Sequence, residues 1–151
     1  MNDSASIPNT GGGLPDYAEL RCVSTFSFLV GASQPEELVQ RAAQMGYRAL
    51  ALTDECSVAG IVRAHVEAKK ADLKLLIGSQ FAVTPPVGEG EDHPDEPGSF
   101  NIVVLACHLD GYGNLCQFIT KLRRASEKGT YRLARDEIAA DELAGCVVIA
   151  S

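Results

Sequence analysis

Seven polar side chains stand where predicted strands end, and their types are the ones that could carry chemistry. In a parallel sheet or barrel, the carboxyl ends of the strands converge on one rim, where active sites usually lie. The strand ends read "RCVS" at 21–24, "TDECS" at 53–57, "GSQ" at 78–80 and "CHLD" at 107–110. The candidate site residues are therefore Arg21, Ser24, Asp54, Glu55, Gln80, His108 and Asp110.

Asp54 is the best single candidate for a functional carboxylate, because it follows directly on the apolar stretch "ALALT". An equally good interpretation is that it caps the turn or the next helix. Asp54 and Glu55 are adjacent, so on an extended chain their side chains point to opposite sides. Arg21 would add a positive charge, which disfavours a cation. These residues alone leave two alternatives open: the site lies elsewhere, or this is the remains of one.

The histidines and cysteines offer no metal-binding pattern of their own. His65 lies in the middle of a predicted helix, His93 in an acidic segment, and His108 at a strand end without a paired ligand. A metal needs several such ligands together, so each histidine is expected to be structural or exposed. The five cysteines include no C-x-x-C pair, which argues against a zinc knuckle or redox motif.

Composition bounds the class of protein. The chain has 151 residues, enough for one domain, with 46% hydrophobic and 22% charged residues. Its apolar runs are strand-sized and its amino terminus does not resemble a secretory signal, so we expect a cytoplasmic protein with no membrane contact. A net charge of −7 argues against stand-alone nucleic-acid binding. The basic run 121–135 favours a solvated helix end, although it could also meet a phosphate backbone.

Helix start and stop residues, together with hydrophobic periodicity, predict an α/β fold in which strands and helices alternate along the chain. Residues 1–15 are expected to form a disordered tail. Two strand–helix–strand units in succession predict parallel strands and right-handed crossovers. A flexible acidic loop is expected at 84–99, because that segment is rich in proline, glycine and carboxylates. Strands are expected at 17–24, 47–54, 73–83, 100–108 and 146–151, and helices at 33–46, 57–72, within 111–129 and at 135–143.

Helix signals also predict which faces are buried. The first helix has a possible capping box of Ser33 and Glu36, proline in its first turn and Gly46 as its stop. The expected inward stripes are Leu38, Ala42 and Met45 in the first helix, Val58, Ile61, Val62, His65 and Val66 in the second, and Leu115, Phe118, Ile119 and Leu122 in the third.

Several separate motifs then occur in a recognisable order and spacing. They are "FSFLxGAS", "PEELVxRAAxxGYRALALTDECSxAG" and "GYGNLCxxIT", with x for any residue. With these motifs, residues 17–151 resemble the amino-terminal PHP (polymerase and histidinol phosphatase) domain of bacterial C-family DNA polymerases, and within that family the error-prone branch. The resemblance implies part of a distorted (β/α) barrel of the PHP type, with about five of its strands at residues 16–151.

The resemblance also implies a degenerate metal site. The metal-binding version of the family carries His-x-His where this chain has Arg21 and Val23, Asp-His at Asp54 and Glu55, and Glu at Gln80. Only Asp54 keeps a ligand of the family's type. We therefore expect no catalytic residue and no metal here, and we expect Arg21 to form an ion pair with Asp54 in place of a metal.

The function implied is that of the PHP segment of an error-prone DNA polymerase used in damage-tolerant (translesion) synthesis, acting as a non-catalytic scaffold. The polymerase domains are absent, and the chain stops at the end of a predicted strand, which suggests truncation. Two alternatives remain: an active metal-dependent phosphoesterase of the PHP superfamily, and a protein-docking module that uses the loop at 84–99.

Cofactors and partners follow from the same resemblance. No cofactor is expected in this chain, Mg²⁺ belongs to the absent polymerase domain, and Zn²⁺ or Mn²⁺ would bind only if the PHP site were functional. The expected partner is the rest of the polymerase chain. Accessory mutagenesis proteins, the sliding clamp and DNA would be contacted through absent regions.

Overall fold

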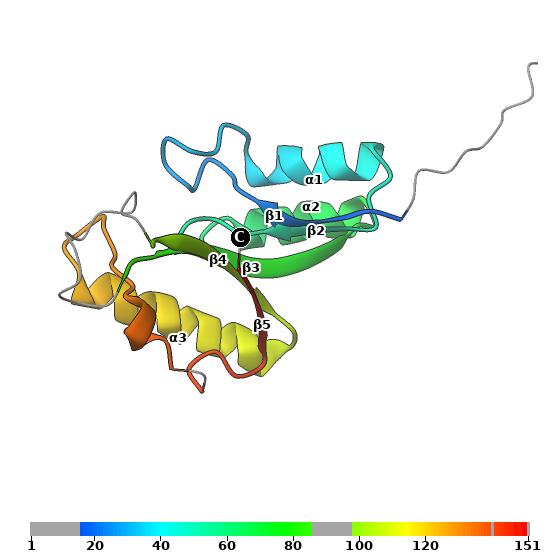
Figure 1. The fold of residues 1–151 in the computed structure, drawn as a ribbon. Coiled ribbons are helices and arrows are strands. Elements are labelled where there is room, and N and C mark those ends of the chain that lie inside the picture. The colour runs from blue at the N-terminus through cyan, green and yellow to red at the C-terminus, as the bar shows by residue number, and fades with distance from the viewer. Residues whose placement is uncertain (1–15, 86–97, 140, 151) are drawn as a thin grey trace, which may run out of the picture.

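The structure is a computed structural model that describes residues 16–85, 98–139 and 141–150. One sheet has the strand order β1-β2-β3-β4-β5 (Figure 1). The strands are β1 (Ala18–Cys22), β2 (Ala49–Leu52), β3 (Lys74–Val83), β4 (Phe100–Ala106) and β5 (Cys146–Ala150). The helices are α1 (Pro35–Gln44), α2 (Ile61–Lys70) and α3 (Leu109–Ala125), followed by a short 3₁₀ helix η1 (Arg135–Glu137). The predicted tail at 1–15 and most of the predicted loop at 84–99 lie outside the described residues.

The predicted α/β class is confirmed as an open sheet of mixed direction. β1, β2 and β3 are parallel, as the two strand–helix–strand units require. β4 runs antiparallel to β3, and β5 antiparallel to β4. The expected convergence of His108 and Asp110 on the common rim is therefore wrong, because the end of β4 points away from the ends of the three parallel strands.

β3 is the central strand and joins two hydrophobic cores. Its first residues pair with β2 and its last six with β4. Leu75 and Ile77 pack into the core beneath α1 and α2, whereas Phe81 and Val83 belong to the core beneath α3. Alternate side chains of a strand point to the same face, so these four side chains lie on one face of β3. Figure 1 shows the curvature of β3 that separates the two groups of helices.

α1 begins one residue later than its predicted capping box. Gln34 is the N-cap and Pro35 the first helical residue. The carboxylate of Glu37 accepts a hydrogen bond from the backbone N–H of Gln34 at 2.8 Å, so Glu37 and not Glu36 has the capping role. Gly46 ends the helix as predicted, with φ of 73° in the left-handed region that favours glycine.

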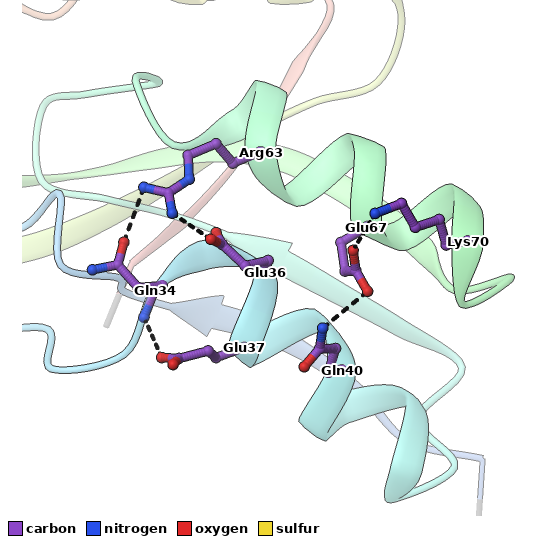
Figure 2. A network of polar contacts seen from close by, with 7 residues as sticks. All are labelled: Gln34, Glu36, Glu37, Gln40, Arg63, Glu67 and Lys70. Carbon is purple, nitrogen blue, oxygen red and sulfur yellow. Dashed lines mark hydrogen bonds and ion pairs between the residues drawn. The ribbon is translucent and has the colours of Figure 1, made fainter.

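Polar side chains link α1 to α2 on the outer surface (Figure 2). Arg63 of α2 donates to the Gln34 side chain at 3.0 Å and forms an ion pair with Glu36. Further along the two helices, the side-chain amide of Gln40 in α1 donates to Glu67 of α2 at 3.0 Å. Such solvent-facing pairs contribute about 0–1 kcal/mol each.

The predicted inward stripe of α2 is wrong for most of its members. Ile61, Ala64 and Ala68 are buried, whereas Val62 is 73% exposed and His65 and Val66 are exposed as well. The two alanines face the core, where their small side chains permit close packing. The face predicted for α3 is confirmed, with Leu115, Phe118 and Leu122 buried and Ile119 packed against them. No helix within the described ranges is long and apolar enough to cross a membrane.

Candidate functional site

Asp54 lies directly after β2 and is 1% exposed. Its Oδ1 accepts hydrogen bonds from the backbone N–H of Ser24 at 2.7 Å and from the Ser27 hydroxyl at 2.8 Å. Its Oδ2 accepts from the Ser24 hydroxyl at 2.8 Å. The buried carboxylate therefore holds the loop between β1 and α1, which corresponds to the interpretation of Asp54 as a cap for a turn.

Two buried serines extend this arrangement to the backbone around Asp54. The Ser79 hydroxyl donates to the carbonyl of Asp54 at 2.7 Å and accepts from the N–H of Ser57 at 3.0 Å. The Ser27 hydroxyl accepts from the N–H of Glu55 at 2.9 Å. Three buried serines (Ser24, Ser27 and Ser79) thus fix the segment after β2 against its neighbours.

Both carboxylate oxygens of Glu55 have protein donors. Oε2 accepts from the Gln80 side-chain amide at 2.7 Å, and Oε1 accepts from the Tyr131 hydroxyl. The Tyr131 oxygen in turn accepts from the backbone N–H of Ala82 at 2.7 Å. Burial, and then the hydrogen bond to Glu55, raise the pKa of Tyr131 far above its usual 10, so its hydroxyl stays a donor.

Arg21 completes a chain of polar contacts across the end of the sheet. Its Nε donates to the Gln80 Oε1 at 2.9 Å, so Gln80 connects Arg21 to Glu55. We call these four residues, Arg21, Gln80, Glu55 and Tyr131, the Gln80 bridge. It links β1, β3, the segment after β2 and the segment after α3. The ion pair between Arg21 and Asp54 stays a prediction.

Arg123 of α3, which belongs to the basic run at 121–135, also contacts this site. Its guanidinium donates to the carbonyls of Cys56 at 3.3 Å, Glu55 at 3.4 Å and Thr130 at 3.2 Å. The same group lies 5.6 Å from the centre of the Tyr131 ring, a cation–π arrangement. The interpretation of residues 121–135 as only a solvated helix end is therefore wrong for Arg123. Sequence reasoning missed both Arg123 and Tyr131, and the one signal was an aromatic residue within a basic run.

The remaining predicted residues lie elsewhere. His108 caps the amino end of α3, where its Nδ1 accepts from the N–H of Gly111 at 3.3 Å, and Asp110 is exposed in the first turn of the same helix. Val23 is half-buried beside the loop that Asp54 holds. His93 is outside the described residues.

The donor set does not fit a metal cluster. A metal ion needs carboxylate or imidazole lone pairs that face it together, whereas the oxygens of Asp54 and Glu55 face N–H and O–H donors. Arg21 adds a fixed positive charge next to Gln80. Across residues 16–85, 98–139 and 141–150, no group of three or more His, Cys, Asp or Glu side chains is placed to hold a metal.

Comparison with known proteins adds three findings. The family described as PHP domain matches residues 19–149. An error-prone DNA polymerase of Ralstonia nicotianae is 60% identical over 140 residues, which cover 93% of this chain and 12% of that protein. An error-prone DNA polymerase of Burkholderia mallei is 54% identical over 129 residues, covering 85% of this chain and 12% of that protein. The chain thus spans about an eighth of the length of these curated relatives.

Solved structures share the fold. A putative metal-dependent phosphoesterase from Bifidobacterium adolescentis aligns with a TM-score of 0.56 and 20% identity, over 74% of this chain and 35% of that one. An amidohydrolase from Chromobacterium violaceum, solved with sulfate and without metal, aligns with a TM-score of 0.54 and 25% identity, over 72% of this chain and 34% of that one. At these identities the likeness concerns the fold of the sheet and its helices.

Proposed function

Because the chain belongs to the PHP domain family, we propose that it is the amino-terminal PHP part of an error-prone DNA polymerase, where it is a scaffold without phosphoesterase chemistry. The names of the relatives support the polymerase, at 60% and 54% identity. The relatives are much longer than this chain, so polymerisation itself belongs to the remainder of such a protein.

One observation carries the scaffold part of the proposal. Every side-chain oxygen of Asp54 and Glu55 accepts a hydrogen bond from the protein, so the two carboxylates at the end of β2 are committed to structure. Freeing them for a metal would leave buried hydroxyl and N–H donors without acceptors, at about 1–3 kcal/mol for each group. A scaffold is the role that this arrangement supports best.

The Gln80 bridge is the set of contacts that would hold the strand ends together in this scaffold. In a metal-containing relative, an ion could tie the strand ends together. Here the neutral amide of Gln80 has a donor end and an acceptor end, and it joins the cation of Arg21 to the anion of Glu55. Its contacts involve no metal ion, so we expect the bridge to be independent of metal concentration.

The finer parts of the proposal concern the whole polymerase. We propose damage-tolerant synthesis in the cytoplasm, with Mg²⁺ bound by the polymerase part. DNA, the sliding clamp and accessory mutagenesis proteins are proposed partners of the regions beyond this segment. The net charge of −7 supports this division, since the segment itself is poorly suited to phosphate backbones.

The test uses the full-length polymerase purified without chelators. We expect substoichiometric Zn²⁺ and Mn²⁺ by elemental analysis, and hydrolysis of p-nitrophenyl phosphate with added Mn²⁺ at the rate of an Asp54→Asn variant. Primer extension past an abasic site tests the polymerase part in the same preparation. Stoichiometric metal together with hydrolysis that Asp54→Asn abolishes would overturn the scaffold and establish the phosphoesterase.

A further inference from the structure

The loop between β1 and α1 presents apolar side chains to solvent. Phe28 is 84% exposed, Leu29 90% and Val30 67%, and Phe26 is also exposed. We call residues 26–30 the apolar loop. Large apolar side chains standing together in solvent mark a contact surface more often than scattered ones do.

Hydrogen bonds of Ser24 and Ser27 anchor the apolar loop to the rest of the protein. The N–H of Ser27 donates to the carbonyl of Ser24 at 2.9 Å, and the N–H of Val30 donates to the carbonyl of Ser27 at 3.0 Å. The hydroxyls of the same two serines donate to the buried carboxylate of Asp54. The loop is thus built on Asp54, which positions it without touching whatever the loop contacts.

Backbone geometry also keeps the loop in this shape. Leu29 has φ of 63°, in the left-handed region that leucine rarely adopts. A Cβ at Gly31 would lie 1.9 Å from the carbonyl oxygen of Ser24, so only glycine permits the chain to turn back there. A conformation that is unfavourable for leucine, yet is held by a buried carboxylate, points to a use for the exposed side chains.

We propose that the apolar loop docks into an apolar recess on the polymerase part of the same longer chain. This inference rests on the proposed function, because it takes the segment to be one part of a polymerase. The relatives support this occupant, since their matched segment is joined to a far larger remainder. Asp54 is then a positioning residue for an interdomain contact.

Size and charge favour this occupant over others. Residues 25–34 contain no Lys, Arg, Asp or Glu, so the loop has no group to pair with phosphates or anionic lipid headgroups. Four side chains are too few for a stable contact between separate proteins, which usually buries about 1,200–2,000 Å². A covalently attached partner has an effective concentration in the millimolar range, so a small surface is enough.

Cysteine labelling of the full-length polymerase tests the docking directly. Leu29→Cys and Val62→Cys each place a thiol at a position that is exposed within this segment, and Val62 belongs to α2 and not to the loop. Labelling by a maleimide is followed by peptide mass spectrometry, which separates these sites from the five native cysteines of this segment and from any in the rest of the polymerase. We expect Leu29→Cys to react at least tenfold more slowly than Val62→Cys, and to react faster when Phe28→Ser is added.

Each outcome of this test has a meaning. Equal labelling rates in a polymerase that still copies DNA would overturn the docking and leave the proposed function intact. Slow labelling that appears only as protein concentration rises, or only with lipid vesicles, would assign the loop to a second copy or to a membrane, and would overturn the inference. Metal content and phosphate-ester hydrolysis, measured in the same preparation, test the proposed function separately.

Discussion

The Nε of Arg21 and the Oε1 of Gln80 lie 2.9 Å apart, although β1 and β3 are not neighbours in the sheet and β2 runs between them. The contact therefore spans the segment that follows β2, where Glu55 pairs with Gln80. Gln80 is 6% exposed and also donates to Glu55. Gln80 therefore lies between the cation of Arg21 and the anion of Glu55 and forms a hydrogen bond with each.

The first prediction concerns this bridge. Arg21→Ala and Gln80→Ala should each lower the free energy of unfolding by about 1–2 kcal/mol, because each removes a charge-assisted hydrogen bond. In a double-mutant cycle measured by urea denaturation, we expect a coupling of about 1 kcal/mol between them.

The matched control for Arg21→Ala is Arg48→Ala, whose ion pair with Asp16 is exposed and should contribute little. A second cycle that combines Arg21→Ala with Asp54→Asn tests the predicted ion pair between those two residues, which requires a similar coupling. Full stability of Arg21→Ala would contradict both the bridge and the ion pair.

The second prediction is that Tyr131→Phe destabilises the protein by about 1–3 kcal/mol. The substitution leaves Glu55 and the N–H of Ala82 without the hydroxyl that each contacts, in a partly buried place. Thermal and urea unfolding should both report the loss. Tyr17→Phe is the control, since its hydroxyl contacts Glu19 in solvent, and equal effects of the two variants would refute a special role for Tyr131.

The third prediction concerns Asp54, which is expected to matter for folding irrespective of metal. Asp54→Asn replaces one carboxylate oxygen by an amide NH₂ that faces hydroxyl or N–H donors from Ser24 and Ser27. We expect a loss of about 2–4 kcal/mol. Unfolding should be compared with and without EDTA, together with Asp110→Asn as an exposed control. A loss that disappears in EDTA would indicate a bound metal instead.

The fourth prediction is a fall in stability at alkaline pH. Burial raises the pKa of the Cys56 thiol from 9 to about 11. Below pH 9 the thiol is protonated in both folded and unfolded chains. Above pH 9 the unfolded chain loses its proton first, so the free energy of unfolding decreases until about pH 11.

Urea denaturation at several values of pH between 8 and 11 measures this fall. The decrease should be shallower in Cys56→Ala than in the wild type, and unchanged in Cys107→Ala, because Cys107 is exposed. Cys22 has a thiol pKa that burial likewise raises to about 11, so Cys22→Ala should also reduce the slope. Parallel curves for all four proteins would show that these thiols do not sense burial.

Much of the fold could be predicted because its signals are local. The strands are short apolar runs between turn residues, and the face of α3 repeats with helical period. The buried face of α2 could not be predicted from hydrophobic periodicity, since Ala64 and Ala68 are buried while the valines of the same helix are exposed. Hydrophobicity ranks valine above alanine, whereas close packing against the sheet and α1 favours the smaller side chain.

The site was predictable only in part. Asp54 and Glu55 follow β2 and lie beside Gln80 within β3, because β2 and β3 are adjacent parallel strands, which a sequence pattern can indicate. Tyr131 and Arg123 come from a segment about fifty residues later, brought in by α3 and by the pairing of Thr84 with Ala134. That contact depends on β4 reversing the chain, and no local signal in the sequence marks the direction of a strand.

The last prediction introduces the ligand pattern that the resemblance to the metal-binding PHP version implies. In the proposed full-length polymerase, Arg21→His, Val23→His, Glu55→His and Gln80→Glu together remove the cation and supply imidazole and carboxylate ligands around Asp54. We expect this variant to retain Zn²⁺ or Mn²⁺ through gel filtration, and its unfolding temperature to rise with added metal, since a ligand at a hundred times its Kd stabilises by about 2.7 kcal/mol. The wild type should show neither effect. Adding Asp54→Asn to the restored variant should abolish the binding, and a restored variant that folds but takes up no metal would show that the serine donors around Asp54, and not the missing ligands, exclude the ion.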